Sequence, residues 1–206
     1  MTTSQQPSGS NPMYVPRFFV RQRITMMVNQ YELLAANPDG SDGQLLAFAQ
    51  QKRMAFKEQV TFYADAAKTQ PVFSFKARKR LDLGSGYDVF DPAGRPLGEF
   101  RKEFGKSLLR SSWRLGGPGL SASGTERNQL VAILRRIWEF VPYLGEIWAP
   151  FVFHFDFVDD DTRQPVMSSE RRMSLRDRYV VDVPDERLDF RLAAAMAVAL
   201  DALQAR

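Results

Sequence analysis

Nine consecutive apolar residues, 192–200 with the sequence LAAAMAVAL, restrict the fold more than any other part of the chain. Their alanine-rich composition favours a helix over a strand. A helix that is apolar on every side must be enclosed, because any face left in water would expose Leu, Met or Val. The run is too short to cross a bilayer, which needs about 20 apolar residues. We therefore expect an enclosed terminal helix, the alternative being an ordinary helix on one side of a core.

Charged residues mark where this helix is expected to begin and end. Asp185 follows Pro184 and is a predicted N-cap, with Glu186 and Asp189 in the first turn and Arg206 at the far end. These signs agree with the helix dipole. The sequence therefore predicts a helix that starts directly after Asp185.

Strand patterns dominate the chain from Arg17 onward. Runs rich in β-branched and aromatic residues alternate with turn residues, at 17–28, 59–63, 71–78, 86–92 and 107–115. A weak repeat also joins 31–48, 87–100 and a looser copy at 155–167. In each, an aromatic residue begins a strand and an Asp/Gly turn reverses the chain. Hairpins that need neighbours to bury their apolar faces imply a sheet that closes on itself.

The remaining segments set the domain limits. The chain has 206 residues, a normal length for one domain, and no cysteine, which excludes disulfides and thiolate metal sites and fits a reducing cytoplasm. Residues 1–16 are polar and proline-containing, carry no secretory signal pattern, and predict a disordered tail. We therefore expect one domain over 17–206, with a helical insertion at about 116–150.

The insertion is expected to contain a loop and an amphipathic helix. Residues 116–124 (GGPGLSASG) predict a flexible loop, and Thr125 a helix N-cap, with a helix at about 125–140 that stops before Pro142. Its apolar stripe would cover one end or edge of the barrel. Alternatively, the helix inserts Trp138 into a membrane surface and places Arg127, Arg135 and Arg136 on phosphates.

Several motifs together resemble a known family. They are YDVFDPAGRPLGEF at 87–100, KSLLRSSWRL at 106–115, RDRYVVDVPDE at 176–186 and LAAAMAVALDAL at 192–203. Over about 17–204 the chain resembles the tubby C-terminal-like superfamily, and within it the LURP-one-related and phospholipid scramblase-like group. The resemblance implies a mainly β (α+β) fold, a closed antiparallel barrel of about 12 strands around the C-terminal helix.

Basic residues suggest a site for anions. Residues 1–115 carry 17 Lys/Arg against 10 Asp/Glu, and 116–206 carry 11 against 14, so the net charges are +7 and −3. Tubby-like relatives bind phosphoinositides through Lys and Arg on the barrel surface. If Phe73, Phe75 and Ala77 face inward, Lys76, Arg78 and Arg80 share the outward face and could bind a phosphorylated head group. The alternative is a solvated strand whose charges discourage aggregation.

Metal binding is not expected. Scramblase-like relatives bind calcium through an acidic run before the terminal helix, but here Arg176 and Arg178 interrupt the matching stretch. Calcium requires six to eight oxygen ligands. The trio 159–161 (DDD) is a hairpin tip whose carboxylates diverge, and predicts a turn.

Catalysis is not expected either. The only histidine, His154, lies in an alternating run that places it on one strand face with Asp156 and puts the phenylalanines on the other. It could be an oriented base, but no G-x-S-x-G elbow or nucleotide-binding glycine motif accompanies it, and a His held by a nearby carboxylate is the alternative. Nucleic acid is not expected as a partner, because no zinc or helix-turn-helix motif accompanies the basic charge.

The sequence thus favours a non-enzymatic, cofactor-free binding module for anionic phospholipid or phosphoinositide head groups. We expect it in the cytoplasm, peripherally at membranes. Two alternatives stay open: phospholipid scrambling between leaflets, and a protein-interaction module that uses 116–150.

Overall fold

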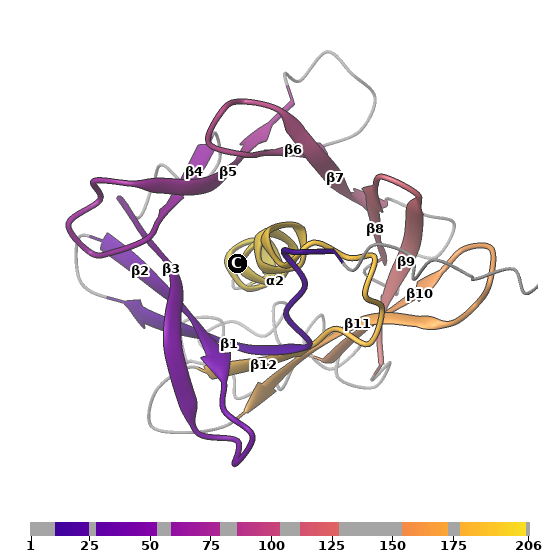
Figure 1. Ribbon diagram of the computed structural model, residues 1–206. Helices are drawn as coiled ribbons and strands as arrows, with labels where there is room; N and C mark the ends of the chain where they lie inside the picture. The colour runs from indigo at the N-terminus through magenta and orange to yellow at the C-terminus, as the bar shows by residue number, and fades with distance from the viewer. Residues whose placement is uncertain are drawn as a thin grey trace, which may run out of the picture.

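The structure is a closed antiparallel barrel (Figure 1). This computed structural model describes residues 11–24, 28–52, 59–78, 86–103, 112–127, 154–172 and 178–204, which contain twelve strands. They are β1 (Arg17–Ile24), β2 (Val28–Ala36), β3 (Asp42–Lys52), β4 (Gln59–Tyr63), β5 (Pro71–Ala77), β6 (Gly86–Phe90), β7 (Pro96–Glu103), β8 (Ser112–Gly117), β9 (Leu120–Glu126), β10 (His154–Asp159), β11 (Pro165–Arg172) and β12 (Arg178–Asp182). Successive strands pair, and β1 pairs with β12 to close the ring. The predicted barrel is confirmed.

The internal repeat corresponds to three real hairpins, β2–β3, β6–β7 and β10–β11. In each, a residue at the start of the turn donates its backbone N–H to a carbonyl across the turn: Asn37 and Asp91 directly after their strands, and Asp159 as the last residue of its strand. The carboxylates of Asp91 and Asp159 also accept backbone N–H groups of their own turns. Asx turns of this kind reverse the chain at each tip, and the predicted turn at 159–161 is confirmed.

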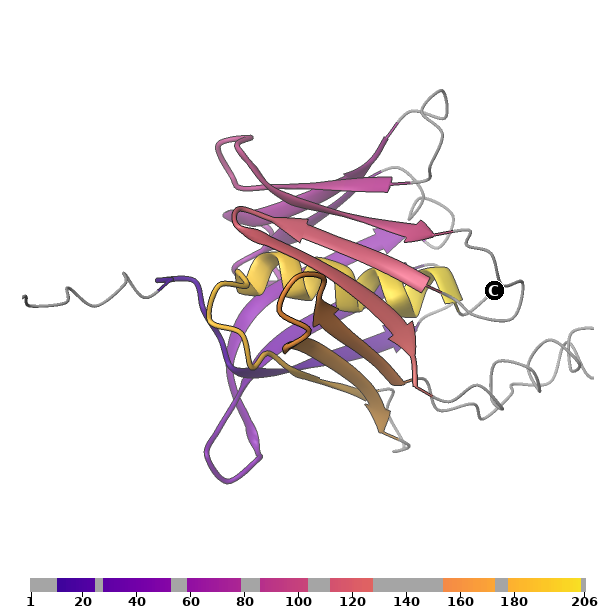
Figure 2. The same ribbon diagram turned by 90° about the vertical axis from the view of Figure 1, so that its right-hand side faces the viewer.

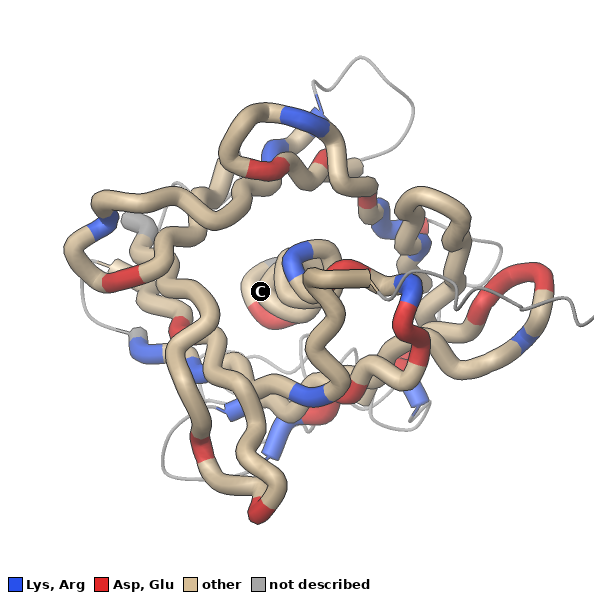
Figure 3. Tube along the Cα trace, in the orientation of Figure 1, with Lys and Arg blue, Asp and Glu red and all other residues tan. Residues whose placement is uncertain are grey.

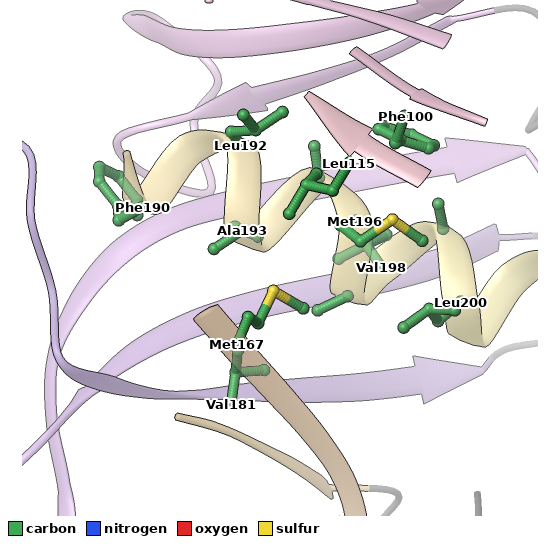
Figure 4. Close-up of a cluster of buried hydrophobic side chains, with 14 of the residues drawn as sticks. Phe100, Leu115, Met167, Val181, Phe190, Leu192, Ala193, Met196, Val198 and Leu200 are labelled. Carbon is green, nitrogen blue, oxygen red and sulfur yellow. The ribbon is translucent and has the colours of Figure 1, made fainter. Parts of the chain in front are cut away.

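The terminal helix α2 (Phe190–Gln204) lies inside the barrel, as Figures 1 and 2 show from two directions. No residue from 192 to 200 exposes more than 5% of its surface, so the predicted enclosure is confirmed. Alternate side chains of the surrounding strands, such as Leu115, Met167 and Val181, pack against the helix (Figure 4). The many alanines keep the helix thin enough to leave room for large aromatic side chains from the wall.

The helix starts later than the sequence suggested. Asp185 accepts the backbone N–H of Arg187 and closes a turn, so it is not the N-cap. The N-cap is Asp189, whose Oδ1 accepts the N–H of Arg191 at 2.9 Å. A carboxylate at that position satisfies an otherwise unpaired N–H and complements the helix dipole. The prediction of Asp185 as the N-cap is therefore wrong by four residues.

The segment after β8 also differs from its prediction. Residues 116–124 are not a flexible loop but the end of β8, a tight turn and most of β9. Thr125 lies inside β9, opposite Asp156, so it is not a helix N-cap. Small residues here provide space, since a Cβ on Gly124 would lie 2.3 Å from the Phe157 ring. The rest of the predicted helix at about 125–140, from residue 128 on, lies outside the described residues.

Residues 11–16 are ordered by contacts with the segment that leads into α2. Pro16 accepts the N–H of Val183 at 2.8 Å, and Met13 accepts the N–H of Phe190 at 2.9 Å. The Tyr14 hydroxyl donates to the carbonyl of Val183 at 2.8 Å. The prediction of a disordered tail is therefore wrong for 11–16, because these residues satisfy backbone groups at the helix entrance. Residues 1–10 lie outside the described residues.

Candidate functional site

The described side chains of the predicted anion site on β5 face outward as expected, but Arg78 is already bound by carboxylates. Phe73 and Phe75 are buried in the core, and Lys76, which follows Phe75, is exposed. Arg78, however, reaches over the outer wall to two carboxylates. Its Nη2 lies 2.5 Å from Asp88 Oδ1 and also donates to Glu99. Arg80 lies outside the described residues.

These contacts stabilise the positive charge of Arg78. Its pKa is raised by hydrogen bonds, first with Asp88 and then with Glu99. A guanidinium bound by two carboxylates has few free N–H donors and little uncompensated charge for a ligand. Lys76 is thus the exposed cation of this strand in the described part of the chain.

Of the predicted membrane-contact residues, only Arg127 is described. Its Nε donates to Asp156 Oδ2 at 2.6 Å on the outer wall, and this hydrogen bond raises the pKa of Arg127. Arg135, Arg136 and Trp138 lie outside the described residues, as does most of the predicted docking segment 116–150. The part of that segment that is described, 116–127, belongs mainly to β8 and β9.

His154 and Asp156 do lie on one face of β10, as predicted, but they have different partners. Nδ1 of His154 is 3.8 Å from Glu170 Oε2, whereas Asp156 pairs with Arg127. Phe155 and Phe157 face the core. His154 thus lies beside a carboxylate on a strand surface. Within the described residues, no group of three or more His, Cys, Asp or Glu could hold a metal.

A stronger candidate site lies on the outer wall formed by β11, β12 and β1. Arg178 is directly opposite Arg172 on one side and directly opposite Arg21 on the other. We call these three residues the arginine row. Figure 3 shows basic and acidic positions together on the lower wall, where these strands lie in Figure 1. Like charges directly opposite one another on neighbouring strands are destabilising, so the row is an arrangement that an anion would stabilise.

Alternation along the strands produces this row. Phe18 and Val20 point into the core, so Phe19 and Arg21 point outward; on β12, Tyr179 and Val181 point inward and Arg178 outward. Three outward apolar residues, Phe19, Leu34 and Val180, pack together on this wall. The guanidinium of Arg178 lies over the Phe19 ring, 3.7 Å from its centre. Stacking orients the guanidinium and leaves the N–H groups at its edge available for hydrogen bonds.

The electrostatics of Arg178 are opposite to those of Arg78. Burial lowers the pKa of Arg178, and the positive charge of Arg172 lowers it further. Its Nη2 is 3.1 Å from Asp42 Oδ1, but its Nε is buried without a hydrogen-bond partner among the described residues. Asp42 also pairs with Arg21. Arg172 is exposed, and no carboxylate partner is found for it in the described ranges.

Sequence reasoning missed the arginine row because Arg21, Arg172 and Arg178 are far apart in the chain. Each arginine could be assigned from the sequence to the outward, polar face of a strand with alternating apolar residues. Only the closure of β1 onto β12 brings them together.

A closed barrel around a buried terminal helix is the architecture that the resemblance to the tubby-like class implies. The LURP-one-related family model matches residues 46–201, well over half of the chain, and the chain belongs to this family. Arg172 and Arg178 lie within the matched region, whereas Arg21 and Asp42 precede it. No curated protein matches the chain. No helix among the described residues is long and apolar enough to span a bilayer.

Proposed function

We propose that this protein is a non-enzymatic binding module for the anionic head groups of phospholipids, phosphoinositides included. The observation that carries the proposal is the arginine row, in which Arg178 is flanked by Arg172 and Arg21 on a partly apolar wall. Guanidinium groups bind phosphate oxygens through paired hydrogen bonds. We place this activity at the cytoplasmic surface of a membrane, with the protein as a peripheral component.

Two alternatives have less support. Scrambling would require a polar path for head groups through the bilayer, and α2 is enclosed by the barrel, where it fills the interior. For a protein partner at 116–150, the described residues offer the strand surface of β8 and β9 and no feature specific to a partner.

Vesicle flotation tests the proposal. Vesicles of phosphatidylcholine alone would be compared with vesicles that also contain phosphatidylserine or a phosphoinositide. We expect flotation only with anionic lipid, and less of it at high salt because screening weakens charge pairing. Failure to float with any anionic vesicle at low salt would contradict the proposal.

Variants locate the site. Arg172→Gln/Arg178→Gln should lose most of the binding. The matched control Lys68→Gln/Arg95→Gln removes the same charge from two exposed side chains elsewhere and should bind nearly as well as the wild type. Arg172→Gln alone, at an exposed position, separates a binding defect from a folding defect. Lys76→Gln tests the β5 site independently, and a larger loss there than in the arginine row would move the site to β5.

A further inference from the structure

The carboxylate of Asp42 lies within the arginine row, where an incoming anion would bind. We infer, on the basis of the function proposed above, that Asp42 is an internal substitute for the ligand. The site then takes a phosphate monoester group, which replaces this carboxylate between Arg21 and Arg178.

Asp42 reaches the row from a strand that is not its neighbour. It is the first residue of β3, and β3, β2, β1 and β12 follow one another in the sheet, so three strand spacings, about 14 Å in a flat sheet, separate β3 from β12. Register shifts near Leu34 bend the β2–β3 hairpin. Gly43, next to Asp42, lets the chain pass close to Ala35, because a Cβ there would lie 2.9 Å from the Ala35 oxygen. The hairpin therefore brings its carboxylate across the wall.

The carboxylate fits the row incompletely. Asp42 Oδ1, although 3.1 Å from Arg178, is a buried oxygen without a hydrogen-bond partner among the described residues, and the same holds for Arg178 Nε. Among the described residues, Asp42 forms ion pairs with Arg21 and Arg178 but none with Arg172. One planar carboxylate thus leaves donors unused on two of the three arginines.

A phosphate monoester matches the hydrogen-bond donors that Asp42 leaves unused on Arg172 and Arg178. It carries three terminal oxygens in a tetrahedral arrangement and a charge of about −1.5 to −2 at neutral pH. It can therefore accept from all three guanidiniums, which a singly charged phosphodiester or carboxylate does less well. Among membrane lipids this group occurs on phosphorylated inositol head groups, and inorganic phosphate offers the same chemistry in solution.

Competition by Asp42 is directly measurable. Asp42→Asn should bind vesicles of phosphatidylcholine and phosphatidylinositol 4-phosphate about fivefold more tightly than the wild type, the effect of removing one partly exposed ion pair. Asp39→Asn removes the same charge from the tip of the same hairpin, where Asp39 caps Ser41, and should leave the affinity within about twofold. Asp42→Glu keeps the carboxylate and should bind like the wild type.

The control arms separate the possible outcomes. Vesicles with unphosphorylated phosphatidylinositol, a phosphodiester, should gain less from Asp42→Asn, and titration with inorganic phosphate shows whether the free anion suffices. Equal affinities of Asp42→Asn and Asp39→Asn, with binding still lost in Arg172→Gln/Arg178→Gln, would overturn the inference and leave the proposed function standing. Absence of binding in every variant would overturn both.

A second measurement uses only the wild type and does not depend on variant folding. If the ligand displaces Asp42, amide hydrogen exchange of residues 36–42 should become faster when phosphatidylinositol 4-phosphate vesicles are added, because the hairpin loses its contacts with Arg21 and Arg178. Unchanged or slower exchange in this segment, with binding observed, would contradict the displacement.

Discussion

The hydroxyl of Tyr31, on β2, donates a hydrogen bond to the carboxylate of Asp201, near the end of α2, over 3.2 Å. Tyr179, on β12, donates to the other oxygen of the same carboxylate. All three residues are at most 6% exposed. The helix is therefore fastened to the barrel wall by charge-assisted hydrogen bonds as well as by apolar packing.

Removing one of these bonds should lower stability. Tyr31→Phe leaves the ring in place and deletes the hydroxyl, so we expect the free energy of unfolding in urea to fall by about 2 kcal/mol, typical of a hydrogen bond to a charged group. Tyr63→Phe is the control, because no hydrogen bond of the Tyr63 hydroxyl is found among the described residues. Equal unfolding midpoints for the two variants would contradict this role of Tyr31.

Acid should weaken the link between the β10–β11 hairpin and the segment before α2. A hydrogen bond from the Thr162 backbone and another from Arg187 lower the pKa of Asp159 to about 2. Because the folded state lowers this pKa, the ionised carboxylate stabilises the fold at any pH above 3.8, the ordinary pKa of an aspartate. This contribution to stability is lost as the pH falls from 3.8 towards about 2. Asp159→Asn should show a shallower loss of stability than the wild type over that interval, in urea titrations at successive pH values. Asp161→Asn, at an exposed neighbour, should follow the wild type.

A methyl group at Gly98 should be poorly tolerated. A Cβ there would lie 2.3 Å from the carbonyl oxygen of Gly116 and 2.7 Å from Leu192 Cδ2, so β7 would be pushed from both β8 and the helix. We expect Gly98→Ala to cost about 3 kcal/mol in the free energy of unfolding. Gly116→Ala, whose Cβ would meet only Glu99 Cγ at 3.5 Å, should cost less than about 1 kcal/mol. Similar thermal midpoints for the two variants would contradict the close packing of β7.

Truncation within the helix should be far more costly than truncation on the wall. Met196 is fully buried in the barrel (Figure 4), so Met196→Ala should lower the free energy of unfolding by about 2 to 5 kcal/mol. Leu45 is 39% exposed, and Leu45→Ala should cost less than about 1 kcal/mol. Denaturant unfolding of both variants measures the difference, and comparable losses would mean that the helix is not the centre of the core.

Local patterns were enough to predict the barrel and its enclosed helix. Alternation identified the strands, and the run at 192–200 could be stable only if it was enclosed. The glycines of 116–124 misled the prediction, because small residues serve equally in a loop and in a strand that faces a large ring such as Phe157. The helix start was missed by four residues because Asp185 and Asp189 have equivalent local signals and only the contacts of the entrance segment separate them.

The candidate site was less predictable, because it depends on pairing between distant strands. The basic run on β5 was visible in the sequence. The ion pairs of Arg78 with Asp88 on β6 and with Glu99 on β7, the next strand beyond it, were not visible. The arginine row likewise requires the register of β1 on β12, and Asp42 joins it only through the bent hairpin. Charge counted along a chain does not show which charges are already paired.

The pairing of β1 with β12 also sets an order for biosynthesis. Within the barrel, β1 is translated first but finds its second partner only after the other eleven strands have been made, and the helix that fills the interior follows later still. Until then the nascent chain has an unpaired strand edge and a ring of aromatic side chains without their central support. Closure of the native barrel around its helix therefore requires that both β12 and α2 have been translated.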